Sequence, residues 1–181
     1  VKGDLSQTAK GKTDQDGKLT VPEIEERERH GTYILGYTDG TFGPSRSMTR
    51  AEAAAIFARL LAEKNGDTIS TVANTRFTDI PAHAWYSGYA KYLNNNGVTY
   101  GKSKTTFAPY DAITRAEFTT LAVRFFDVYG DGDAEIMEQF KSFDDVSDGY
   151  WAAEYIKAAA KHGWITGYGD GSFRADRQIT R

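Results

Sequence analysis

The chain has 181 residues, of which 40% are hydrophobic and 13% aromatic, enough for one domain with a real core. Its formal net charge is -3 and it contains no sustained basic run, which argues against nucleic acid and anionic membranes as partners. It has no cysteine, which excludes disulfides and thiolate metal sites. No apolar run approaches the roughly 18 residues of a membrane-spanning helix, so no membrane insertion is expected.

Residues 1–29 are polar and are predicted to form a linker or N-terminal extension. The stretch from Asp14 to Glu23 partly matches a calcium-binding loop, with Gly17 at its sharp turn. However, Lys12 stands where the first calcium ligand belongs. A hairpin or linker turn at Asp16–Gly17 is therefore the better interpretation.

A short motif recurs along the chain. Met48–Glu52 (Met-Thr-Arg-Ala-Glu) is matched by Ile113–Glu117 (Ile-Thr-Arg-Ala-Glu), and Ile179–Arg181 begins a third copy. Glycines and phenylalanines recur at the same offsets of 65 and 66 residues: Gly36, Gly101 and Gly167, and Phe42, Phe107 and Phe173. Such internal periodicity indicates a protein of three repeats.

The repeated motif predicts the start of a helix. Thr-x-x-Glu before an apolar run is a capping box, so Thr49 and Thr114 are expected to be N-caps. Apolar residues follow at helical spacing in both copies, which predicts helices that bury one face. These residues are Ala53, Ile56, Phe57, Leu60 and Leu61, and Phe118, Leu121, Ala122, Phe125 and Phe126. The first helix should end near Asn65–Gly66.

The capping box does not explain the arginine that follows each threonine. At the first helical position a cation meets the positive end of the helix dipole, at a cost of about 0.3 to 1 kcal/mol. A helix N-terminus together with an arginine fork can bind a carboxylate or phosphate. The alternative is that each arginine pairs with a neighbouring acidic side chain or points into water. Recurrence favours surface anion sites at Arg50, Arg115 and Arg181.

A second type of helix opens repeats 2 and 3. Phe77 and Asp79 precede Trp85, and the same residue types recur 66 residues later with Trp151. These helices should stop at Gly97 and Gly163. Their tyrosines, Tyr89 and Tyr155, are expected to pack in the core, whereas Trp85 and Trp151 fit either the core or a ligand platform. The stretch Asp127–Glu138 hints at a calcium loop but is better interpreted as an inter-repeat loop.

These motifs resemble the S-layer homology repeat of bacterial surface proteins. The resemblance rests on Gly36–Phe42 before Met48–Glu52, on Phe77–Asp79 before Trp85, and on Phe143–Asp145 before Trp151. It implies a mainly α fold in which three helix-loop-helix repeats form a pseudo-threefold spindle around a central three-helix bundle. The repeats would span 30–66, 77–130 and 143–181, the last being truncated at its C-terminal end.

The resemblance also implies a function outside the cell. Grooves between adjacent repeats would bind a secondary cell wall polymer attached to peptidoglycan, commonly through a terminal pyruvylated N-acetylmannosamine. The module would thereby anchor an S-layer protein or surface enzyme in the bacterial cell wall, with other S-layer proteins as possible neighbours. A pyruvyl ketal carries a carboxylate, which is the kind of anion that the arginines require.

The family's ligand-contacting positions can be carried over residue by residue. They fall on the arginines Arg50, Arg115 and Arg181, the acids Asp79 and Asp145, the aromatics Trp85 and Trp151, and the turn glycines Gly40 and Gly171. No catalytic residue, metal or cofactor is implied. The chain departs from the pattern in repeat 1, which lacks the Phe-x-Asp and Trp opening, and in repeat 2, where 102–105 replace Asp-Gly.

Two other functions remain open. A carbohydrate-active enzyme could use an acid pair such as Asp79 with Glu117, but no spacing singles out two carboxyls across one cleft. A structural module could instead use its grooves for self-assembly.

The ends of the sequence suggest a piece of a longer chain. Val1 is not followed by a leader pattern, and Arg181 stands where a third capped helix should begin. We expect that helix to follow Arg181 or to be supplied by a partner's segment.

Overall fold

The computed structural model describes residues 12–13, 19–20, 34–130 and 142–181. The chain divides into two units, Val1–Gly31 and Thr32–Arg181. In the first unit β1 (Lys12–Thr13) pairs antiparallel with β2 (Leu19–Thr20), with Lys12 opposite Thr20. This is the strand pairing expected of the predicted hairpin. The turn at Asp16–Gly17 and most of the two calcium-like stretches lie outside the described residues.

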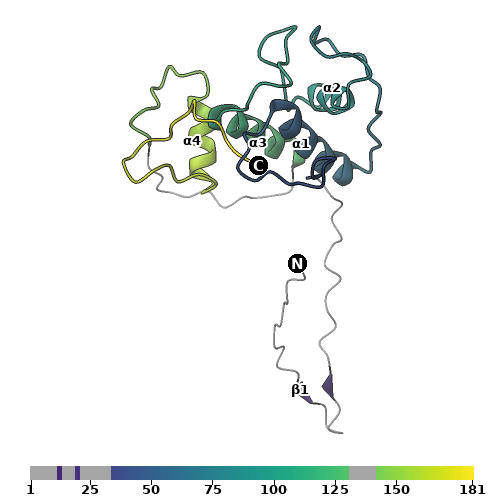
Figure 1. The fold of residues 1–181 in the computed structure, drawn as a ribbon. Helices are drawn as coiled ribbons and strands as arrows, with labels where there is room; N and C mark the ends of the chain where they lie inside the picture. The colour runs from purple at the N-terminus through teal and green to yellow at the C-terminus, as the bar shows by residue number, and fades with distance from the viewer. Residues whose placement is uncertain (1–11, 14–18, 21–33, 131–141) are drawn as a thin grey trace. The chain divides into compact units, whose positions relative to one another are not determined.

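The described part of the second unit contains α1 (Arg50–Asn65), α2 (Ser87–Asn95), α3 (Arg115–Tyr129) and α4 (Ala153–Lys161). Figure 1 shows them in the order α4, α3, α1, α2 across the unit, and each neighbouring pair is in contact. The prediction of a mainly α fold is therefore confirmed. None of the helices in the described residues is both long and apolar enough to cross a membrane.

Both predicted capping boxes are present. The Thr49 hydroxyl accepts a hydrogen bond from the Glu52 backbone N–H, while the Glu52 carboxylate accepts one from the Thr49 N–H. Thr114 and Glu117 do the same at the start of α3. At the other end of α1, Gly66 adopts φ 69°, a left-handed conformation that costs glycine little and ends the helix.

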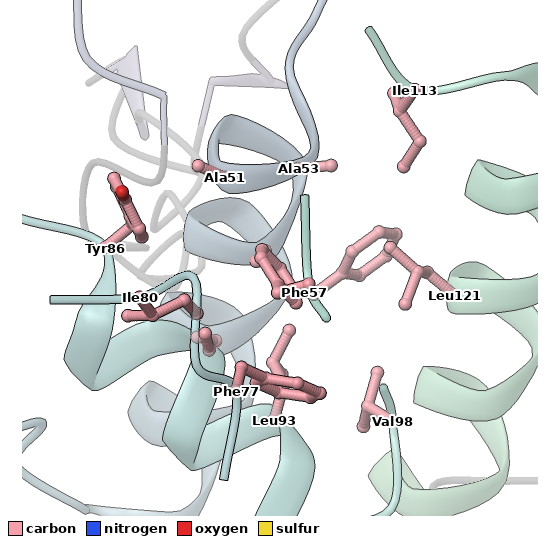
Figure 2. Packing of buried hydrophobic residues seen from close by; sticks show 14 of the residues in the cluster. Ala51, Ala53, Phe57, Phe77, Ile80, Tyr86, Leu93, Val98, Ile113 and Leu121 are labelled. Atoms are coloured by element: carbon pink, nitrogen blue, oxygen red, sulfur yellow. The ribbon is translucent and has the colours of Figure 1, made fainter. Parts of the chain in front are cut away.

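Helix α1 is the centre of the main core. Phe57 packs against two rings of α3, with ring centroids 5.3 Å from Phe118 and 5.2 Å from Phe125. Figure 2 shows Phe57 within the cluster, with Leu93 on the α2 side and Leu121 on α3. The prediction of a single buried face is wrong for α1, because the helix packs against both α2 and α3. Small residues allow this approach, and all of the following are buried: Ala51, Ala53, Ala54, Ala55, Ala58 and Ala62.

The segments before the capped helices close into a ring. The Met48 N–H donates to the Ile179 carbonyl (2.9 Å), Ile179 donates to Ile113 (3.2 Å), and Ile113 donates to Met48 (2.9 Å). A second ring joins Arg50 N–H to Asp111 O, Arg115 N–H to Arg177 O, and Arg181 N–H to Arg46 O. Each repeat thus satisfies the backbone groups of the next, which is the expected pseudo-threefold arrangement.

A smaller core cluster lies under the loop of repeat 3. Phe143 and Phe173 contact each other at 5.3 Å and pack with Ala116 of α3 and Ile156 of α4. Of the central bundle, the described residues supply α1 and α3. The third capped helix was expected to follow Arg181, and it stays a prediction.

Candidate functional site

Arg50, the first residue of α1, is buried rather than at the surface. Only 6% of it is exposed, and its Nε donates to the Phe107 carbonyl at 2.8 Å. Its Nη1 lies 3.1 Å from Oε1 of Glu117, the capping-box glutamate of the next repeat. The anion that Arg50 meets is therefore internal, as in the alternative that the sequence left open.

Arg181 of repeat 3 makes the equivalent contact with the capping-box glutamate of repeat 1. Its Nη1 lies 2.7 Å from Oε1 of Glu52, and its guanidinium stacks 4.3 Å from the centre of the Tyr37 ring. The Tyr37 hydroxyl donates to the same glutamate oxygen at 3.0 Å. Burial would raise the pKa of Glu52, but hydrogen bonds from Thr49 and Tyr37 and the charge of Arg181 hold that pKa below its usual value. We call these two contacts, Arg50–Glu117 and Arg181–Glu52, the inter-repeat clasps.

Arg115 differs from the other two arginines. Its Nε donates to the Phe173 carbonyl at 2.9 Å, and its guanidinium lies 4.7 Å from the Phe173 ring and 5.1 Å from the Tyr168 ring. Within residues 34–130 and 142–181, no carboxylate forms an ion pair with it. Its role in binding an external anion stays a prediction.

The two predicted acidic residues bind loop backbone. The Asp79 carboxylate accepts from the N–H groups of Phe107 (2.9 Å) and Ala108 (2.6 Å). Ala108 has φ 56°, a left-handed conformation that is unfavourable for alanine and that these bonds help to hold. Asp145 accepts from Phe173 and Arg174, both at 2.7 Å. Both acids therefore shape the loops around the aromatic anchors, and a ligand role for them stays a prediction.

The hydrogen bonds also affect the ionisation of Asp145. Burial alone would raise the pKa of this carboxyl, but the backbone donors of Phe173 and Arg174 bring that pKa below its usual value. Asp145 is thus held in the charged form that the loop requires.

Trp85 and Trp151 lie just before α2 and α4 and are largely exposed, at 52% and 57%. Trp85 rests edge-on against Tyr86 at 5.4 Å, which leaves much of its indole accessible. This exposure favours the ligand platform over the core. The turn glycines Gly40 and Gly171 have φ of 80° and 86°, so they shape the loops through their backbone.

One groove brings residues of all three repeats together. It has a volume of about 370 Å³ and runs between the loop of repeat 1, α1, Trp85 of repeat 2 and Arg181 of repeat 3. Of the predicted site residues it contains Trp85 and Arg181. We call it the α1 groove; its lining residues are Ile34, Leu35, Gly36, Tyr37, Thr38, Met48, Glu52, Ala55, Ile56, Arg59, Trp85 and Arg181.

Arg59 is a lining residue that sequence reasoning missed. Its Nη2 donates to the Tyr89 hydroxyl at 3.1 Å, and Arg124, 65 residues later, donates in the same way to Tyr155 at 2.9 Å. The recurrence of this arginine at the repeat offset was visible in the sequence and could have identified it. Tyr89 and Tyr155 thus carry an arginine on their hydroxyls, and Tyr89 also packs against the core.

The α1 groove combines apolar walls with cationic character. Its described lining residues include two arginines and one carboxylate, Glu52, which is already paired with Arg181. A single engaged carboxylate does not form the acid pair of a glycosidase. The pair considered from the sequence, Asp79 with Glu117, is occupied by loop amides and by Arg50.

Comparison with known proteins places this arrangement in a family. The S-layer homology domain matches residues 14–54, 76–119 and 142–181. The chain is 36% identical over 159 residues to cell surface glycoprotein 1 of Acetivibrio thermocellus, covering 84% of this chain and 7% of that protein. It is 32% identical over 173 residues to the cellulosome-anchoring protein of the same organism, covering 94% and 37%.

A third relative is the surface-layer 125 kDa protein of Lysinibacillus sphaericus, 35% identical over 135 residues, covering 74% of this chain and 10% of that protein. The chain therefore spans well under two thirds of the length of these relatives. Domains of this family anchor S-layer proteins and enzymes to the cell wall. The three matched stretches confirm the resemblance, and the chain belongs to the S-layer homology domain family.

Proposed function

We propose that this chain is a non-catalytic module that anchors a longer protein to the bacterial cell wall by binding an acidic secondary wall polymer. The observation that carries the proposal is the α1 groove, where Trp85, Arg59 and Arg181 meet across repeat boundaries. A site built from three repeats exists only in the folded array, as expected of a groove between repeats. The names of the relatives, a cellulosome-anchoring protein and a surface-layer protein, support the same role.

The proposed ligand is the pyruvylated N-acetylmannosamine end of the polymer. Its ketal carboxylate would meet the guanidinium groups that line the groove, because these groups form strong charge-assisted bonds to carboxylates. Its ketal and acetyl methyl groups would pack against apolar walls such as Leu35 and Ile56. The sugar ring would lie against Trp85, whose exposed indole offers a flat surface.

The proposal is tested with the 181-residue chain and purified wall polymer, before and after chemical removal of pyruvate. Calorimetry should show at least about tenfold weaker binding, or about 1.4 kcal/mol, after removal. Affinity should also decline with salt, though less than for a fully exposed ion pair. Equal affinity for the two polymers would contradict recognition of the carboxylate.

Two further measurements separate the other functions. A reducing-sugar assay on the same polymer should remain at background, whereas release of sugar would favour an enzyme. Sedimentation without polymer should show no assembly of the chain through its grooves. Assembly together with absent polymer binding would favour the self-assembly module.

A further inference from the structure

We infer that the acidic sugar binds in the α1 groove and not at the equivalent place beside α3. At that place, which we call the α3 side, Tyr100 occupies the space that is open in the α1 groove. This inference rests on the proposed function and specifies where the ligand binds. The two sides are related by the repeat itself. The residues of the α3 counterpart that correspond to the α1 groove include Arg50, Tyr100, Lys102, Leu121, Arg124 and Trp151.

The frame of the two sides is conserved between the repeats. Glu52 and Glu117 are each clasped by an arginine of another repeat, at 2.7 and 3.1 Å. Arg59 and Arg124 each donate to a tyrosine of the adjacent opening helix. Each side also has a tryptophan that is more than half exposed. Any difference in binding must therefore come from the residues that fill the space between these shared groups.

Tyr100 is the main difference. The guanidinium of Arg124 lies 4.8 Å from the ring of Tyr100, in the loop before α3, and 4.7 Å from the ring of Tyr155, in α4. At the position of Tyr100, repeat 1 has Leu35, which has no aromatic ring and which lines the α1 groove. A carboxylate approaching Arg124 would have to displace a favourable cation–π contact.

The backbone of Tyr100 is fixed as well. Its carbonyl accepts a hydrogen bond from Arg76 Nη2 at 2.8 Å, and the next residue, Gly101, has φ 80° and lies against Phe77 and the Thr106 carbonyl. A side chain at position 101 would collide with both groups, so this close approach requires a glycine. Tyr100 is thereby held beside Arg124.

A second difference concerns the loop that borders each side. In repeat 1, Tyr37 stacks between Arg46 (4.4 Å) and Arg181 (4.3 Å). In repeat 2, Lys102 stands at the position of Tyr37 and Asp111 at the position of Arg46, and these two residues form a 2.6 Å ion pair. Asp111 places a carboxylate on the α3 side where the α1 side has the cation of Arg46. The two positions together carry a charge of +1 in repeat 1 (Tyr37 and Arg46) and zero in repeat 2 (Lys102 and Asp111), which makes the α3 side less favourable for an anionic ligand.

The test uses the methyl glycoside of pyruvylated N-acetylmannosamine and the indole N–H signals of the three tryptophans, which report binding by location. In the wild type, the Trp85 signal should shift on titration, while those of Trp151 and Trp164 should not. Leu35→Tyr should abolish the Trp85 shift or weaken it about tenfold. Tyr100→Leu should leave the Trp85 titration unchanged and make Trp151 shift.

The matched control is Tyr110→Leu, at a tyrosine that is 72% exposed, which should titrate like the wild type. Tyr100→Leu should gain a Trp151 shift, so this variant still tests the inference if the Leu35→Tyr protein misfolds. A Trp151 shift in the wild type equal to that of Trp85 would overturn it, as would polymer binding without any Trp85 shift. Failure of the wild type to bind both the glycoside and the wall polymer would instead overturn the proposed function.

Discussion

Arg50 and Arg115 occupy the same position in consecutive repeats, but their surroundings differ. Arg50 is buried and clasped to Glu117, whereas Arg115 is partly exposed and meets a carbonyl and two rings. Among the described residues, Arg50 and Arg181 each lie beside the capping-box glutamate of another repeat, and Arg115 lies beside the Phe173 carbonyl and ring.

The same comparison holds for Arg59 and Arg124, which both donate to a tyrosine hydroxyl. Arg59 lies on the Tyr89 ring and borders the α1 groove, while Arg124 lies beside the rings of Tyr100 and Tyr155. Repeats thus conserve the position of a charge and vary what surrounds it.

The largest expected effect is on the buried clasp. Arg50→Ala should lower the free energy of unfolding by about 3 kcal/mol, because it leaves Glu117 charged and mostly buried without its cation. Urea unfolding measures the change. Arg115→Ala is the matched control and should lose only about 1 kcal/mol, for one hydrogen bond to a carbonyl. If the two variants lose the same free energy of unfolding, the ion pair between Arg50 and Glu117 does not stabilise the fold.

The second clasp can be broken through its carboxylate. Glu52→Gln should cost about 2 kcal/mol at pH 7, since it keeps the capping geometry but removes the charge that pairs with Arg181. The folded pKa of Glu52 is depressed, so its contribution is present above about pH 4.5 and is lost as pH falls through the folded pKa.

The difference in unfolding free energy between the wild type and Glu52→Gln should therefore shrink towards pH 3. Asp145 and the other carboxylates titrate in both proteins and cancel from this difference. A difference that stays constant from pH 7 to pH 3 would contradict the role assigned to the Glu52 charge.

The smallest expected effect is on binding. Arg59→Gln should weaken binding of the pyruvylated polymer about tenfold, or about 1.4 kcal/mol, because it removes a cation from the α1 groove. Arg124→Gln removes the equivalent cation on the other helix and should leave affinity unchanged. Calorimetry at one salt concentration measures both, and equal losses would remove the distinction between the two sides.

The local features of this fold were predictable from the sequence. The capping boxes at Thr49 and Thr114 and the helix stop at Gly66 involve residues within one helical turn of each other, so their spacing identifies them. The recurrence of motifs likewise predicted three repeats, and comparison with known proteins confirmed their family.

The clasps could not be predicted in the same way. Arg181 and Glu52 are 129 residues apart, and only the closed ring of backbone hydrogen bonds brings them together. The recurrence of the arginine therefore suggested an external anion for Arg50 and Arg181, which both have an internal one. The exposure of Trp85 was also undetermined, because residues at the end of a helix can face either the core or solvent.

The most direct test of binding in the α1 groove is a crystal structure of the chain soaked with the methyl glycoside of pyruvylated N-acetylmannosamine. We expect a sugar in the α1 groove, with its ring against Trp85 and its carboxylate on the side of Arg59 and Arg181. The space between Tyr100 and Trp151 should contain no sugar. A ligand ordered beside α3 with the α1 groove empty would contradict the assignment of the sugar to the α1 groove.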